Sequence, residues 1–167
     1  ADEPTTALDV TIQAQVLDVL RTAQQRTNAA TILITHDLGL IAEQADRVIV
    51  MYGGKVVEVA DVHALFSAPR HPYTLGLMSS LPRLDVDLQQ LEPIPGAPPN
   101  LIDLPPGCAF HPRCRVSKGR QICRTEVPPL RDVGAGQLSA CHFADEVPAE
   151  MAVVSDEMGA RLGTAGP

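Results

Sequence analysis

The spacing of apolar positions near the start of the chain indicates an amphipathic helix. Apolar residues recur every three or four positions between residues 12 and 23, and Gln and Arg side chains occupy the intervening polar face. Asp9 precedes this pattern, and its carboxylate is suited to accept hydrogen bonds from the free N–H groups of a first helical turn. The pattern therefore predicts a helix over residues 10–27, with Asp9 as its N-terminal cap.

A strand-like pattern follows. Residues 30–35, ATILIT, form a short, β-branched and mostly apolar run. Such a run is typical of a strand covered on both faces, as in a parallel sheet. Residues 47–52 and 55–60 are two further strand-like runs, and Gly53 and Gly54 between them supply the positive φ values of a tight hairpin turn.

Short helices are predicted over residues 38–45, 62–67 and 73–81, and Pro72 is acceptable at the first position of the last one. The order helix, strand, helix, hairpin, helix indicates the α/β class. Because one parallel-type strand cannot form a sheet alone, the remaining strands are expected upstream of Ala1.

The composition changes near residue 82. The chain of 167 residues contains 15 Pro, of which seven lie between residues 93 and 112, and all four Cys lie between residues 108 and 141. Pro disfavours both helices and central strands. We therefore expect an α/β part over residues 1–81, a small irregular Pro/Cys-rich extension over 82–144, and a disordered acidic tail over 145–167.

The overall charge excludes one class of function. Lys and Arg total 13 against 20 Asp and Glu, which gives a net charge of -7. This balance argues against broad electrostatic binding to nucleic acid. No apolar run in the sequence approaches the roughly 18 residues that would span a bilayer.

Three polar residues follow apolar segments in a way that suggests a binding site. Asp2 and Glu3 are adjacent carboxylates, of which one could hold a hard cation such as Mg²⁺ and the other could orient a water molecule. His36 follows the apolar run of residues 30–35. Ligands of open α/β sheets bind at the carboxyl ends of the strands, so these side chains are expected on one rim.

These segments carry a family resemblance. ADEPTTALD resembles the Walker B segment and D-loop of ABC-transporter ATPases, ILITHD resembles their switch-histidine segment, and VIVMYGGKVVE resembles the hairpin that follows. The resemblance implies ATP and Mg²⁺ as cofactors. It implies that Asp2 helps to hold Mg²⁺ through water and that Glu3 polarises the attacking water. Asp9 would lie at the interface between two ATPase domains, and His36 would contact the γ-phosphate.

Other motifs of that family are absent from the sequence. No G-x-x-x-x-G-K-[ST] loop, glutamine loop or LSGGQ-type signature occurs. The chain therefore reads as the carboxyl-terminal portion of an ATPase. On its own, it is predicted to be inactive.

The second half narrows the resemblance. HPYT at residues 71–74, and IPGAPPNLIDLPPGCAFHPRC after it, resemble the extension on ATPase subunits of oligopeptide and dipeptide importers, which nickel importers share. This implies a second ATPase subunit, two transmembrane permease subunits and an external solute-binding protein as partners, at the cytoplasmic face of the membrane. Peptide import is the expected function. The alternatives are nickel import and a nonenzymatic metal-binding or regulatory module.

The cysteines leave several interpretations open. Cys108, Cys114, Cys123 and Cys141 are separated by gaps of five, eight and seventeen residues. Disulfides need an oxidising compartment, and structural zinc prefers close C-x₂₋₄-C pairs, which the sequence lacks. Four thiolates hold a [4Fe–4S] cluster at varied spacings, and the resemblance associates these cysteines with such a cluster. Zinc, disulfides and four unligated thiols remain the alternatives.

The charge around the cysteines fits a cluster, although a solvated basic face explains it equally well. Residues 108–131 carry six basic side chains and one acid, a local charge of +5 that could offset an anionic cluster. One position departs from the family pattern, because Arg115 stands where a Pro commonly follows the second Cys.

Overall fold

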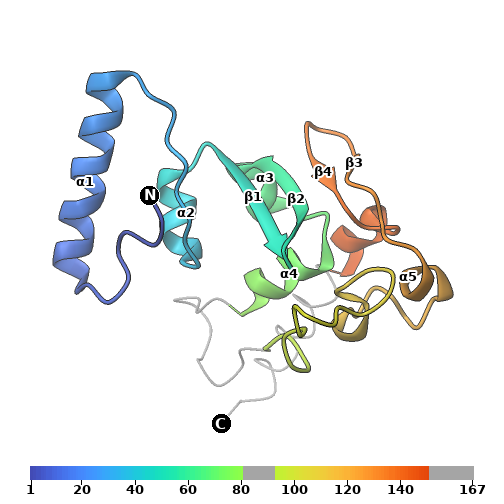
Figure 1. Cartoon of the computed structure of the whole chain (residues 1–167). Coiled ribbons are helices and arrows are strands. Elements are labelled where there is room, and N and C mark those ends of the chain that lie inside the picture. The colour runs from blue at the N-terminus through green and yellow to red at the C-terminus, as the bar shows by residue number, and fades with distance from the viewer. Residues whose placement is uncertain (81–92, 151–167) are drawn as a thin grey trace, which may run out of the picture. The chain divides into compact units, whose positions relative to one another are not determined.

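The computed structural model describes residues 1–80 and 93–150. The chain divides into two compact units, Ala1–Glu43 and Gln44–Pro167, which are described separately below (Figure 1). Among the described residues, no helix has both the length and the apolar character needed to cross a lipid bilayer.

The first unit contains the predicted amphipathic helix. Helix α1 spans Val10–Thr27, and one carboxylate oxygen of Asp9 accepts hydrogen bonds from the N–H groups of Thr11 and Ile12, both at 3.0 Å. Asn28 ends the helix in the left-handed region, with φ of 50°, which Asn tolerates better than most residues. The predicted helix and its cap are both confirmed.

The strand predicted over residues 30–35 is not formed in the described structure. Only Ile34 pairs, through an isolated parallel bridge with Asp2, and Ile32 and Ile34 are 79% and 55% exposed. A buried parallel strand needs hydrogen-bonded neighbours and covering layers on both faces, and the described residues supply only the short segment at Asp2. Helix α2, Leu38–Gln44, follows and ends one residue before its predicted end.

The second unit is built around a four-stranded sheet of order β1-β2-β4-β3. Strands β1, Arg47–Tyr52, and β2, Lys55–Asp61, form the predicted antiparallel hairpin. Gly53 and Gly54 have φ of 56° and 75°, the values that a two-residue hairpin turn requires. Along β1, every second side chain is buried, so one face of the hairpin forms the core.

Two helices follow the hairpin. Helix α3 spans Val62–Ser67 as predicted, and Asp61 caps it through its carboxylate. Helix α4 spans Pro72–Ser79, with Pro72 at its first turn as expected. It ends before residue 81, its predicted end, because Ser80 already forms the C-terminal cap.

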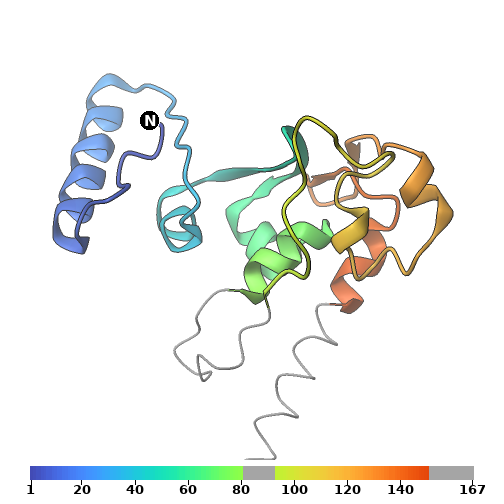
Figure 2. The ribbon, with the colours of Figure 1, turned by 60° about the horizontal axis from the view of Figure 1, so that its bottom comes forward.

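The cysteine-bearing part combines irregular chain with short elements. Residues 93–107, drawn in yellow-green to yellow, contain no helix or strand (Figure 2). The short elements that follow are the 3₁₀ helix η2, His111–Arg113, helix α5, Gln121–Thr125, strands β3, Arg131–Asp132, and β4, Leu138–Ser139, and the 3₁₀ helix η3, Ala144–Glu146.

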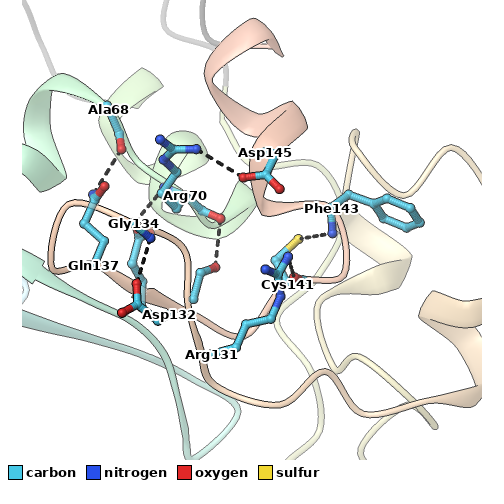
Figure 3. A network of polar contacts seen from close by, with 11 residues as sticks. Ala68, Arg70, Arg131, Asp132, Gly134, Gln137, Cys141, Phe143 and Asp145 are labelled. Carbon is cyan, nitrogen blue, oxygen red and sulfur yellow. Dashed lines mark hydrogen bonds and ion pairs between the residues drawn. The ribbon is translucent and has the colours of Figure 1, made fainter.

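Strand β4 attaches this part to the hairpin. It pairs antiparallel with β2, and the Ser139 hydroxyl donates to the carbonyl of Arg70 at 2.8 Å. The Gln137 side-chain amide donates to the carbonyl of Ala68 at 3.1 Å (Figure 3). Residues on both sides of the predicted boundary therefore share one sheet. The boundary itself, at residue 82, lies outside the described residues and stays a prediction.

The predicted disordered tail does not begin at residue 145. Val147 is fully buried and packs with Leu75 and Val116. Three of the acidic residues form ion pairs, Asp145 with Arg70, Glu146 with Arg120 and Glu150 with Lys118. The acidic composition suggested solvation, but burial of Val147 and these paired charges hold residues 145–150 against the unit. The rest of the predicted tail, 151–167, lies outside the described residues.

Candidate functional site

The first candidate site is the loop that carries Glu3. The N–H of Thr6 donates to the carbonyl of Glu3 at 3.2 Å, which closes a four-residue turn with Pro4 in its second position. Pro favours that position because its ring fixes φ near the required value. Asp2 lies directly before the turn and forms the bridge with Ile34.

This bridge brings Glu3 next to His36, as expected for side chains at the ends of two parallel segments. Nδ1 of His36 lies 3.1 Å from Oε1 of Glu3. Both side chains remain accessible to solvent, His36 at 80% and Glu3 at 46% exposure. The pair is therefore open to a ligand, while the catalytic roles of both residues stay predictions.

The Glu3 carboxylate has a second partner, the hydroxyl of Thr6, which donates to Oε2 at 2.9 Å. The hydrogen bond from His36 and then that from Thr6 lower the pKa of Glu3 below its usual value. An ionised Glu3 can only accept in this hydrogen bond, so Nδ1 of His36 must carry the proton that is donated. Nε2 is then the ring nitrogen that remains for a ligand. Sequence reasoning missed Thr6, although the E-P-x-T turn pattern signals it.

Asp9 lies six residues after Glu3 and acts locally as the cap of α1. Its place at an interface between two ATPase domains stays a prediction. The predicted Mg²⁺ role of Asp2 likewise stays a prediction. The donor set fits, because carboxylate oxygens are the ligands that Mg²⁺ prefers.

The second candidate site is a small cavity in the cysteine-bearing part. All four cysteines line it, together with His71, Phe110 and other apolar and histidine side chains. All four are free thiols. Residues spread from 108 to 141 are thus brought to one place by the fold.

Backbone contacts place each cysteine at this cavity. The N–H of Cys108 donates to the carbonyl of Cys123 at 2.9 Å, and Cys123 is held in α5. Cys114 ends η2. The thiol sulfur of Cys141 accepts a hydrogen bond from the N–H of Phe143 at 3.4 Å (Figure 3).

Burial raises the pKa of all four thiols, to about 12 for Cys114 and about 11 for Cys141. Neighbouring arginines oppose this effect, Arg131 at Cys141 and Arg120 at Cys123. The protein alone therefore keeps these thiols neutral, and a bound cation would be required to hold them as thiolates.

The described residues contain no group of three or more His, Cys, Asp or Glu side chains arranged to hold a single metal ion. Two nearby histidines hydrogen-bond to the backbone, His111 to the carbonyl of Cys108 and His142 to that of Glu126. These hydrogen bonds hold both histidine rings beside the cavity that the four cysteines line.

His71, from the HPYT motif, is also held by the protein. Its Nδ1 accepts a hydrogen bond from the N–H of Tyr73 at 3.1 Å, and its ring bonds to the backbone of Ala140. Burial lowers its pKa to about 3, so the ring is neutral. His71 thus joins α4 to the residue before Cys141.

Comparison with known proteins places these features in context. Residues 57–123 match the family model described as "Oligopeptide/dipeptide transporter, C-terminal region". The chain is 52% identical over 143 residues to the dipeptide transport ATP-binding protein DppD of Escherichia coli, which is 86% of this chain and 43% of that protein.

Two further ATP-binding proteins of oligopeptide transport are also similar to the chain. The oligopeptide transport ATP-binding protein OppD of Mycobacterium tuberculosis is 55% identical over 141 residues, 84% of this chain and 23% of that protein. The oligopeptide transport ATP-binding protein AppD of Bacillus subtilis is 51% identical over 150 residues, 90% of this chain and 45% of that protein. The chain spans less than half the length of each of these relatives.

Proposed function

Because the chain belongs to the ATP-binding proteins of oligopeptide and dipeptide transporters, as a carboxyl-terminal part, we propose that the whole protein hydrolyses ATP to drive an ABC importer of peptides. The observation that carries this proposal is the contact between Glu3 and His36. It joins the ADEPTTALD and ILITHD segments, which are far apart in sequence, into one polar site.

The chemistry divides among the residues of this site. Glu3, which is ionised and still accessible, accepts a hydrogen bond from the attacking water and so polarises that water. His36 donates from Nδ1 to Glu3, and Nε2 would donate to the γ-phosphate when the ring carries a proton on both nitrogens. Asp2 would hold Mg²⁺ through water, and its place before Glu3 would bring the positive charge that the ion supplies to the phosphates.

The proposed assembly follows from the family resemblance of the sequence. Two ATP-binding subunits would pair, with Asp9 of each in the D-loop at their interface, and would act on two transmembrane permease subunits at the cytoplasmic face of the membrane. An external solute-binding protein would deliver the peptide. Nickel is the alternative cargo of the same arrangement.

We further propose that Cys108, Cys114, Cys123 and Cys141 hold a [4Fe–4S] cluster. The support is that all four thiols line one small cavity and that the family resemblance of the sequence associates these cysteines with such a cluster. Four Cys thiolates are the ligand set that a [4Fe–4S] cluster takes. Arg120 and Arg131 lie where they would offset the negative charge of thiolate ligands.

The ATPase proposal is tested by Glu3→Gln in the intact transporter. The variant keeps the shape of the side chain but loses the carboxylate, so ATP hydrolysis should be abolished while ATP binding persists. Glu43→Gln, at an exposed position of α2, is the matched control and should hydrolyse normally. Near-normal hydrolysis by Glu3→Gln would refute the assigned role.

The present chain alone should show no micromolar affinity for Mg²⁺–ATP.

The cluster proposal is tested on anaerobically purified intact protein. Iron and acid-labile sulfide should be found together, with absorbance at roughly 400 nm. Cys114→Ser should lose this absorbance, whereas Thr125→Ala, at an exposed position two residues after Cys123, should retain it. A colourless protein with about one zinc per chain, or one with four freely titratable thiols and no metal, would contradict the proposal.

A further inference from the structure

The loop after Glu3 holds one polar side chain that no catalytic assignment uses. The hydroxyl of Thr6 donates to Oε2 of Glu3 at 2.9 Å, while Oε1 of the same carboxylate meets Nδ1 of His36 at 3.1 Å. The two oxygens of Glu3 thus have different partners, one from the local loop and one from a segment over thirty residues away.

The local sequence forces the contact with Thr6. The turn from Glu3 to Thr6 is closed by its backbone hydrogen bond and has Pro4 in the position that Pro favours. In such a turn the first and fourth residues lie side by side. The next backbone hydrogen bond, from the N–H of Leu8 to the carbonyl of Thr5, continues the fold of the loop toward the Asp9 cap.

The consequence for Glu3 is a fixed carboxylate plane. A side chain with one partner can still rotate about its last torsion, whereas partners on both oxygens define that rotation. An ionised carboxylate offers about four lone-pair sites, so about two remain for water after Glu3 has accepted hydrogen bonds from His36 and Thr6. Precise orientation of a general base matters because misplaced groups lose most of their effect.

We propose that Thr6 is a positioning residue, whose hydroxyl holds Oε2 of Glu3 and so orients the carboxylate that polarises the attacking water. This proposal rests on the proposed role of Glu3 as the base. The lowered pKa of Glu3 supports it, since the hydrogen bond from Thr6 favours the ionised form.

The alternative is that Thr6 only helps to form the turn. The turn needs the backbone N–H of Thr6 and the ring of Pro4, but it does not need a hydroxyl. Thr5, its neighbour in the same turn, has the same side chain and provides a matched control. A variant that removes only the hydroxyl therefore separates the two roles.

The experiment measures ATP hydrolysis in the intact transporter for Thr6→Val, Thr6→Ser and Thr5→Val. Loss of one hydrogen bond to a charged group corresponds to about a tenfold change. We expect kcat of Thr6→Val to fall about tenfold, with KM for ATP within about twofold of the wild-type value. The acidic limb of its pH–rate profile should move to higher pH. Thr6→Ser should restore both values, and Thr5→Val should resemble the wild type.

Folding is checked by ATP binding, and Thr6→Ala replaces Thr6→Val if the latter does not fold. Unchanged kcat and pH profile in the hydroxyl-free variant, equal losses in Thr5→Val, or no recovery in Thr6→Ser would overturn the proposal. Glu3→Gln separates the two hypotheses. If it abolishes hydrolysis while Thr6→Val behaves as wild type, only the role of Thr6 fails; if it hydrolyses ATP normally, both fail.

Discussion

The buried carboxylate of Glu58 accepts a hydrogen bond from the backbone N–H of His71 at 3.0 Å. It also accepts one from the N–H of Arg70 at 2.6 Å. Burial raises the pKa of Glu58, and its hydrogen bonds to neighbouring groups oppose that rise. Strand β2 thereby fixes the segment that leads into α4, where a buried N–H without an acceptor would be costly.

Replacing Glu58 with Ala should therefore destabilise the chain. Two buried N–H groups lose their acceptor, and each unsatisfied group costs about 1–3 kcal/mol. We expect the free energy of unfolding to fall by about 2–6 kcal/mol in urea titrations. Glu126→Ala, at an exposed position, should change it by less than about 0.5 kcal/mol. Equal effects of the two variants would show that Glu58 does not hold this segment.

His71 should make stability depend on acid pH. Its pKa is about 3 in the folded chain and near 6.5 when unfolded, so the unfolded state binds the extra proton first as pH falls. The stabilising contribution is complete above pH 6.5 and is lost progressively down to about pH 3. The slope attributable to His71 should approach about 1.4 kcal/mol per pH unit within that window.

The measurement is urea unfolding at several pH values for the wild type, His71→Gln and His63→Gln. The His71 variant should lose stability at pH 7 and should show a smaller slope between pH 6.5 and 3. His63, which is exposed on α3, provides the control and should leave the slope unchanged. An identical slope in the His71 variant would contradict a buried neutral ring.

Elements set by local sequence could be predicted accurately. The α1 pattern and its Asp9 cap need contacts only within a few residues, and the Gly53-Gly54 turn fixes the hairpin register. The contact between Glu3 and His36 was also foreseeable, because both follow segments expected to run in parallel. For α1 and the hairpin, the residues that carry the pattern lie close in sequence to the element that they form. For Glu3 and His36, both residues follow segments that were expected to end at the same rim of the sheet.

Elements that depend on distant partners could not be predicted in this way. The run at residues 30–35 has strand composition, yet pairing depends on neighbours, and only Ile34 finds one. Strand β4 has two residues, too few for any periodicity, and exists because β2 offers a free edge. Val147 lies in an acidic stretch, and its burial depends on Leu75 and Val116.

Asp9 should contribute to stability apart from any role at an interface. Asp9→Ala removes the acceptor of two N–H groups at the start of α1 and should cost about 1 kcal/mol, with reduced helix content by circular dichroism. Asp9→Asn keeps a capping oxygen and should retain most of the helix. If Asp9→Asn nevertheless lowers ATP hydrolysis in the intact transporter, charge at this position matters beyond capping. Equal helix content in Asp9→Ala and wild type would contradict the cap.

Gly107, directly before Cys108, should tolerate no side chain. Its φ is 70°, and an added Cβ would lie 2.6 Å from the carbonyl oxygen of Cys123 and 2.6 Å from the carbonyl carbon of Arg124. Both are backbone atoms, so the chain around α5 must move and the Cys108–Cys123 contact must open. Gly134 has φ of 90° but open space around it, so Gly134→Ala isolates the conformational cost alone, about 1–2 kcal/mol. We expect Gly107→Ala to lose at least about 2 kcal/mol more than Gly134→Ala in urea unfolding, because it adds overpacking to that cost.

Gly107→Ala should also lower the iron content of anaerobically purified protein, which Gly134→Ala should not do. Similar stability and similar iron content in the two variants would show that the close approach of Gly107 to α5 does not organise the cysteine cavity.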